Sequence, residues 1–182
     1  MTFANPAGGA AAAAPAYVRA LLDLLGDRDP LAVAAEQLPW LERRIAGLDD
    51  ATLRRPEAPG KWSAIEILQH LADSEIVIAW RSRQILTEDR PVIQGFDQDT
   101  WARRLGYDGM PLAVTLGQLA GARAANLRLW RSLGPADLAR EGLHTERGPE
   151  SLGLLLRLMG AHDLVHRRQL DRVLTAAGAP GG

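Results

Sequence analysis

Apolar residues in the last part of the chain repeat with helical spacing, and this pattern constrains the fold more than any other feature. From Ser151 to about Ala176 they recur every third or fourth position, as on one face of an amphipathic helix. The segments 29–48, 63–86 and 111–133 have the same period. No run alternates with period two, as a half-buried strand does. The sequence therefore predicts an all-α protein.

Local signals indicate where these helices begin. Asp29-Pro30 is typical of an N-cap followed by proline at the first helical position. Ser63-Ala-Ile-Glu66 fits a capping box. Pro39 is expected to bend or split its helix. With a short accessory helix over 17–25, the four main helices predict an antiparallel four-helix bundle.

Length and composition indicate one domain. The chain has 182 residues, of which 47% are hydrophobic, enough to bury a sizeable core. We expect residues 1–15, rich in alanine and glycine, to be a disordered tail, and residues 16–178 to form the domain. A long connection over 87–110, with several glycines and prolines, is the segment expected to cover a site.

The same composition argues against several classes of protein. The formal net charge is −1 and basic residues form no run, so nothing indicates nucleic-acid binding. No apolar stretch approaches the roughly 18 residues that a membrane span needs. The chain contains no cysteine, which excludes disulfides, cysteine metal ligands and a cysteine nucleophile. These observations favour a cytoplasmic protein.

Two histidines share the apolar face of the last helix. His162 and His166 are four residues apart, one helical turn, and both fall at the middle of the apolar stripe together with Gln169. Polar groups in a bundle core need partners, because an unpaired buried polar group costs a few kcal/mol. A metal ion would satisfy both imidazoles. The alternative is that each is a core histidine bonded to a backbone carbonyl.

A third histidine and a neighbouring carboxylate lie in another helix. His70 is at the edge of the apolar face of the 63–86 helix, and we predict that it completes a three-histidine metal site with His162 and His166. Asp73 shares its side of the helix. It either supports an imidazole N–H or is a solvated surface carboxylate.

Two charges occupy apolar faces. Glu75 projects from the middle of one such face, and Arg123 from the middle of the stripe in the 111–133 helix. Buried charges are nearly always paired, so an ion pair between them is the preferred interpretation. The alternative is catalytic: Arg123 grips an anionic substrate, or Glu75 moves a proton. His144, in the loop before the last helix, is assigned a loop or capping role, with a fourth ligand or substrate contact as the alternative.

The ordered set of motifs resembles the DinB-like family, in its YfiT-like branch related to bacillithiol transferases. The matching segments span about 29–174 and are Gly60-Lys-Trp-Ser63, His70-Leu-Ala-Asp-Ser-Glu75, Phe96-Asp-Gln-Asp-Thr-Trp101, Ala122–Leu127, Gly142–Gly148 and His162–Gln169. The resemblance implies an up-down-down-up four-helix bundle, a divalent metal held by His70, His162 and His166, and a homodimer.

The resemblance leaves the reaction open. It implies a metal-dependent thiol S-transferase that joins a small thiol of the bacillithiol or mycothiol type to an electrophile. One alternative is a metal-dependent hydrolase with Asp73 or Glu75 as general base. Another is a non-catalytic metal-binding stress-response protein. An all-imidazole site suits transition metals. Zinc or nickel is expected first, with iron, copper or manganese as alternatives.

Overall fold

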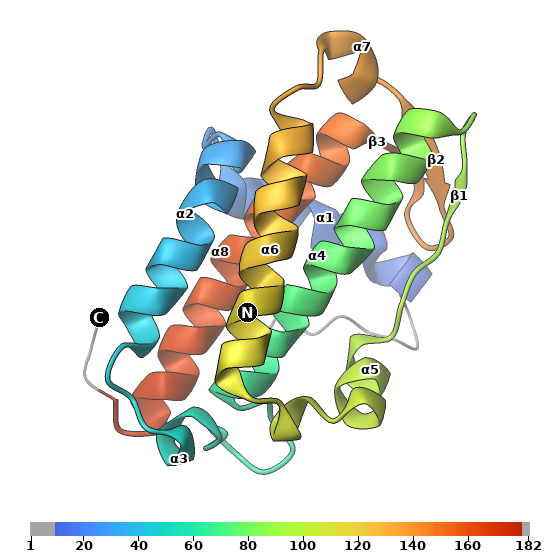
Figure 1. The fold of residues 1–182 in the computed structure, drawn as a ribbon. Coiled ribbons are helices and arrows are strands. Elements are labelled where there is room, and N and C mark those ends of the chain that lie inside the picture. The colour runs from blue at the N-terminus through green and yellow to red at the C-terminus, as the bar shows by residue number, and fades with distance from the viewer. Residues whose placement is uncertain (1–9, 180–182) are drawn as a thin grey trace.

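Four long helices form a bundle in the computed structural model, which describes residues 10–179. They are α2 (Pro30–Ile45), α4 (Ala64–Thr87), α6 (Leu112–Trp130) and α8 (Leu152–Ala176). Following the colours in Figure 1, α2 and α8 run downward while α4 and α6 run upward. Helix α4 packs between α6 and α8, and α2 packs against α8 and α6. The predicted up-down-down-up bundle is therefore confirmed.

The caps that the sequence predicts are present. Asp29 accepts a hydrogen bond from the Leu31 amide at 2.9 Å, with Pro30 at the first helical position of α2. Glu66 reaches back to the Ser63 amide at 2.8 Å, as in a capping box. Helix α2 continues through Pro39 and is not split there.

The N-terminal accessory helix starts earlier than expected. Helix α1 runs Ala10–Leu25 and packs along α8, so residues 10–15 of the predicted tail are helical. Alanine has the highest helix propensity, which explains how a low-complexity segment extends this helix. Residues 1–9, the rest of that predicted tail, lie outside the described residues. Two one-turn helices, α3 (Asp50–Leu53) and α7 (Pro135–Leu138), occupy loops.

A small sheet, which the sequence did not predict, packs against α4 and α8. Its strands are β1 (Val92–Ile93), β2 (Glu141–His144) and β3 (Gly148–Ser151), in the order β1-β2-β3. The first pair is parallel and the second antiparallel. Strands of two to four residues are too short to give a period-two signal.

The connection between the parallel helices α4 and α6 has its own structure. After β1 it forms α5 (Gln98–Leu105) and a 3₁₀ turn η1 (Tyr107–Gly109) that packs on α4. Asp97 caps α5 by accepting from the Thr100 amide. Within residues 10–179, no helix is both long and apolar enough to cross a bilayer.

Candidate metal centre

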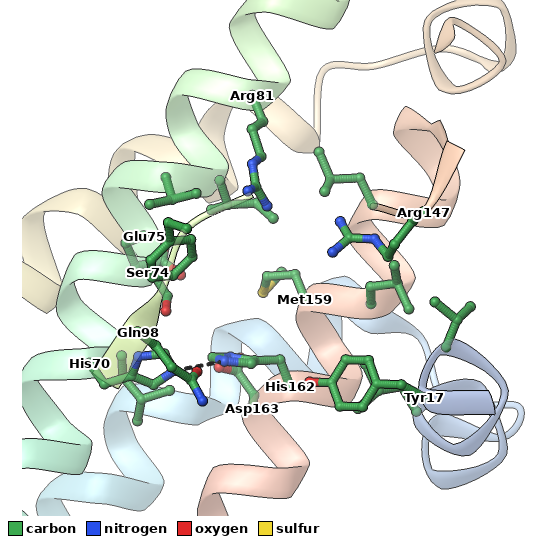
Figure 2. Close-up of a pocket in the computed structure, with 18 of the residues that line it drawn as sticks. Tyr17, His70, Ser74, Glu75, Arg81, Gln98, Arg147, Met159, His162 and Asp163 are labelled. Carbon is green, nitrogen blue, oxygen red and sulfur yellow. Dashed lines mark hydrogen bonds between the residues drawn. The ribbon is translucent and has the colours of Figure 1, made fainter. Parts of the chain in front are cut away.

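Three imidazoles meet between α4 and α8. The Nε2 atom of His162 lies 3.0 Å from Nε2 of His70 and 3.0 Å from Nε2 of His166. The ligand atoms of all three lie within 4.8 Å of one another. Because His162 and His166 are one turn apart on α8, both rings face the same point of α4, where His70 projects (Figure 2 draws His70 and His162).

Hydrogen bonding alone does not satisfy this cluster. The Nδ1–H of His166 donates to Gln169 Oε1 at 2.8 Å, which leaves Nε2 of His166 as a lone pair. A single proton on His162 Nε2 can serve only one of its two neighbours. The Nδ1 of His70 is buried without a partner among the described residues. Lone pairs converging on one point are suited to a cation, so the residues fit a metal.

Burial keeps the three imidazoles neutral. Desolvation lowers the pKa of His162 to about 4 and holds the pKa of His70 and of His166 well below 6.5. The Trp62 ring, with its centroid 5.0 Å from that of His70, covers one side. Neutral imidazole is the form that binds metals, so the ligands are ready without losing protons.

Asp73 differs from both sequence interpretations. It is buried, and it does not bond His70, whose free nitrogen has no partner in residues 10–179. Its carboxylate accepts from Tyr107 Oη at 2.6 Å, Gln118 Nε2 at 2.7 Å and Gln69 Nε2 at 3.1 Å. It therefore links η1 and α6 to α4 and makes no hydrogen bond to the histidines.

The predicted ion pair between Glu75 and Arg123 is present and has a third member. Arg123 contacts Glu75 Oε1 at 2.8 Å and binds both oxygens of Asp163 at 2.6 and 3.0 Å. It also donates to the Ala34 carbonyl of α2 at 2.8 Å, so one guanidinium joins all four bundle helices. Asn126 donates to Glu75 Oε2 at 2.9 Å. Burial raises the pKa of Glu75, with the Arg123 charge opposing.

Sequence reasoning missed Asp163 as a member of this network. It lies between the two metal-helix histidines, one residue after His162 and three before His166. That position turns it toward the same interior as the histidines, and it is 1% exposed. A helical wheel that included acidic residues near the apolar stripe would have found it.

A pocket of about 140 Å³ opens beside the histidines. His70 and His162 lie at one end of it (Figure 2), and the Glu75–Arg123–Asp163 cluster lines the adjacent wall. Tyr17 of α1 forms part of the far side. Phe96 and Gln98 also line it, so the 87–110 connection covers this pocket as expected.

His144 does not belong to the triad. It is the last residue of β2, and its Nδ1 accepts from the Glu146 amide at 3.1 Å, which is a turn-stabilising role. Its Nε2 is buried without a partner in residues 10–179. Burial, with the charges of Arg147 and Arg81, lowers the pKa of His144 to about 3. The only group of potential ligands found within 10–179 is the His70, His162 and His166 triad.

The fold and the three-histidine cluster together define a helical-bundle protein with a candidate metal centre. The chain belongs to the DinB superfamily, which it matches over residues 37–170. The bundle resembles that of YfiT from Bacillus subtilis, described as a probable metal-dependent hydrolase with an unusual four-helix bundle topology. The TM-score is 0.74 at 22% identity, covering 83% of this chain and 87% of YfiT.

Several relatives carry the name "putative metal-dependent hydrolase". One, from Oceanobacillus iheyensis, is 30% identical over 135 residues, which is 72% of this chain and 78% of the relative. Another, from Geobacillus thermodenitrificans, is 32% identical over 108 residues, or 59% of this chain and 61% of that relative.

Proposed function

We propose that the protein is a metal-dependent enzyme whose ion is held by His70, His162 and His166. The observation that carries this proposal is the convergence of three neutral Nε2 atoms, on buried His70 and His166 and half-buried His162, that hydrogen bonds cannot all satisfy. Three imidazoles leave room for a further ligand, as in catalytic sites. We propose zinc or nickel as the metal, since imidazole suits them, with iron, copper or manganese as alternatives.

For the reaction, we propose transfer of a small thiol to an electrophile. When bound, the ion would lower the pKa of a coordinated thiol or water. Neither of the two carboxylates predicted as a general base is free: three donors occupy Asp73, and Arg123 with Asn126 holds Glu75. A thiol that is acidified by coordination alone needs no such base, which favours the transferase.

The second candidate is a metal-dependent hydrolase. The names of the relatives favour it, and so does the position of Glu75, whose side chain lines the pocket. In this alternative the Glu75 carboxylate leaves Arg123 to take a proton from water. The choice between the two reactions therefore depends on whether Glu75 stays bound to Arg123 and Asn126 during the reaction.

Elemental analysis of protein purified without a metal-affinity tag tests the metal site. We expect about one equivalent of a divalent transition metal in the wild type and none in His162→Ala, which should stay helical by circular dichroism. His144→Ala is the matched control, since His144 is buried but outside the triad, and it should keep the metal. A wild-type protein that binds no metal, even when these ions are supplied, would refute the proposal.

Two assays on the metal-loaded protein separate the reactions. Thiol-dependent loss of an electrophile such as monochlorobimane supports the transferase, and ester or amide cleavage without thiol supports the hydrolase. Inactivity in both, with one equivalent of bound metal, would support the non-catalytic stress-response protein instead.

We also propose the cytoplasmic homodimer that the composition and the family resemblance lead us to expect. Ile76 and Trp80 support an association between copies, because they are 52% and 63% exposed and lie one turn apart on α4. Sedimentation equilibrium of the full chain measures the oligomeric state, and a monomer at all concentrations contradicts the dimer.

A further inference from the structure

Arg81 is a buried cation in the wall of the pocket and has no carboxylate partner within residues 10–179. It is 8% exposed, and none of the ion pairs found there includes it. It donates to the Gln94 carbonyl at 2.5 Å, and its guanidinium lies 6.0 Å from the Phe96 ring centroid. Since buried charges are nearly always paired, this charge is available to an anion from outside.

A second arginine faces it. Figure 2 shows the guanidinium groups of Arg81 and Arg147 directed from opposite sides into the same part of the pocket, which lies apart from His70 and His162. Arg147 is already neutralised by Glu150, through bonds of 2.8 and 3.1 Å. Burial, with the Arg147 charge, lowers the pKa of Arg81 to about 10, with the charges of Glu150 and Glu146 opposing, so Arg81 is still protonated at neutral pH. An anion between the two groups would relieve both the desolvation and the repulsion.

Leu155, Leu158 and Met159 give the space between Arg81 and the histidines an apolar wall on the α8 side, whereas Ser74 and Glu75 line its α4 side. Arg81 follows His70 by eleven residues on α4, about 16 Å along the helix axis at 1.5 Å per residue. Its side chain leans back toward the N-terminal end of α4, which shortens the gap that a ligand must bridge. A ligand that reaches both ends is therefore elongated, with an apolar face toward α8.

The charges of the lining indicate which anion fits. Three arginines (Arg81, Arg123, Arg147) and three acidic residues (Glu75, Glu146, Asp163) line the pocket. Arg123 and Arg147 each contact a carboxylate directly, whereas Arg81 contacts none and has only the more distant charges of Glu146 and Glu150 near it. A single guanidinium without a direct carboxylate contact matches a monoanion better than a dianion. Its planar fork fits the two oxygens of a carboxylate.

We propose that Arg81, with Arg147 opposite, forms a carboxylate subsite of the pocket. It binds the acidic end of an elongated small molecule whose other end lies at His70 and His162. The placement of the other end at the histidines rests on the proposed function, whereas the carboxylate subsite itself does not require a metal. Arg81 thus selects ligands by charge at a distance from the reacting end.

Isothermal titration calorimetry of metal-free protein with hexanoate and with hexanamide tests the subsite. The two probes share an apolar chain and differ in charge. We expect hexanoate to bind wild-type protein at least about 10-fold more tightly, as for hydrogen bonds to a charged group. Arg81→Gln should remove this preference and leave hexanamide binding unchanged. Arg83→Gln is the matched control, since Arg83 is exposed on the same helix and outside the pocket.

Several results would overturn the proposal. Equal binding of the two probes by the wild type would do so without any variant, as would no binding of hexanoate. An undiminished preference in Arg81→Gln would also do so. If that variant is unfolded by circular dichroism, Arg81→Lys keeps the charge without the fork, and equal affinities of this variant for hexanoate and hexanamide would then refute selection by charge. Because these titrations use metal-free protein, they give the same answer whether or not the metal proposal holds.

Discussion

Replacing Arg123 with methionine tests whether one buried guanidinium holds the bundle together. The side chain is 4% exposed and contacts Glu75 on α4, Asp163 on α8 and the Ala34 carbonyl on α2. Methionine fills much of the space but leaves two buried carboxylates without a counter-charge. Breaking a buried ion pair in this way costs about 3–5 kcal/mol. We expect Arg123→Met to lose that much free energy of unfolding in urea titrations followed by circular dichroism.

Two further variants determine whether the loss has this cause. Arg172→Gln breaks the exposed pair with Glu57 and should cost no more than about 1 kcal/mol. The triple variant Arg123→Met, Glu75→Gln, Asp163→Asn removes the stranded charges. It should therefore be more stable than Arg123→Met alone, because neutral amides cost less to bury. If Arg123→Met loses no more than Arg172→Gln, or if the triple variant recovers nothing, the reasoning fails.

Three other predictions concern the metal centre and the helix packing. Gln169→Ala removes the acceptor for the His166 Nδ1–H and should weaken metal affinity about 10- to 100-fold in chelator competition; an unchanged affinity contradicts this orienting role. Gly160→Ala places a methyl group 3.0 Å from Pro30 and should lower the free energy of unfolding by about 1–3 kcal/mol in urea titrations. An unaltered urea midpoint would mean that α2 and α8 can move apart at no cost. Metal-free protein should lose stability as pH falls from about 6.5 toward 4. Burial lowers the pKa of the triad histidines, so below about pH 6.5 the unfolded chain binds protons that the folded protein does not. Each histidine therefore lowers the free energy of unfolding by at most about 1.4 kcal/mol per pH unit. Urea midpoints that are equal at pH 7 and about pH 5.5 would refute this linkage.

The helices and their caps were predictable because their signals are local. Asp29-Pro30 and the Ser63–Glu66 box are complete within a few residues, and each marks the start of a helix in the structure. The convergence of His162 and His166 follows from helical geometry alone. That His70 joins them was predicted from the presence of the other two histidines, because its own position at the edge of an apolar face is compatible with several roles.

The remaining features depend on contacts between distant segments. Asp73 is held by Tyr107 and Gln118, residues 34 and 45 positions away, so no spacing rule connects them. The sheet pairs β1 with β2 across about fifty residues, and each strand is too short to show its own pattern. Arg81 gave no signal in the sequence, since an arginine on a helix is ordinarily exposed. It is buried because the 87–110 connection and the β2–β3 hairpin pack over this part of α4.

The separation of the histidines along the chain connects metal supply to the lifetime of the protein. His70 and His162 are 92 residues apart, so the unfolded chain has no preformed site and an ion that binds there binds the native state. At a free concentration 100-fold above its dissociation constant, such an ion adds about 2.7 kcal/mol to the free energy of unfolding. A cell starved of the metal would then hold a larger unfolded fraction of this protein, exposed to proteases. Its abundance would report on the metal pool before any change in synthesis.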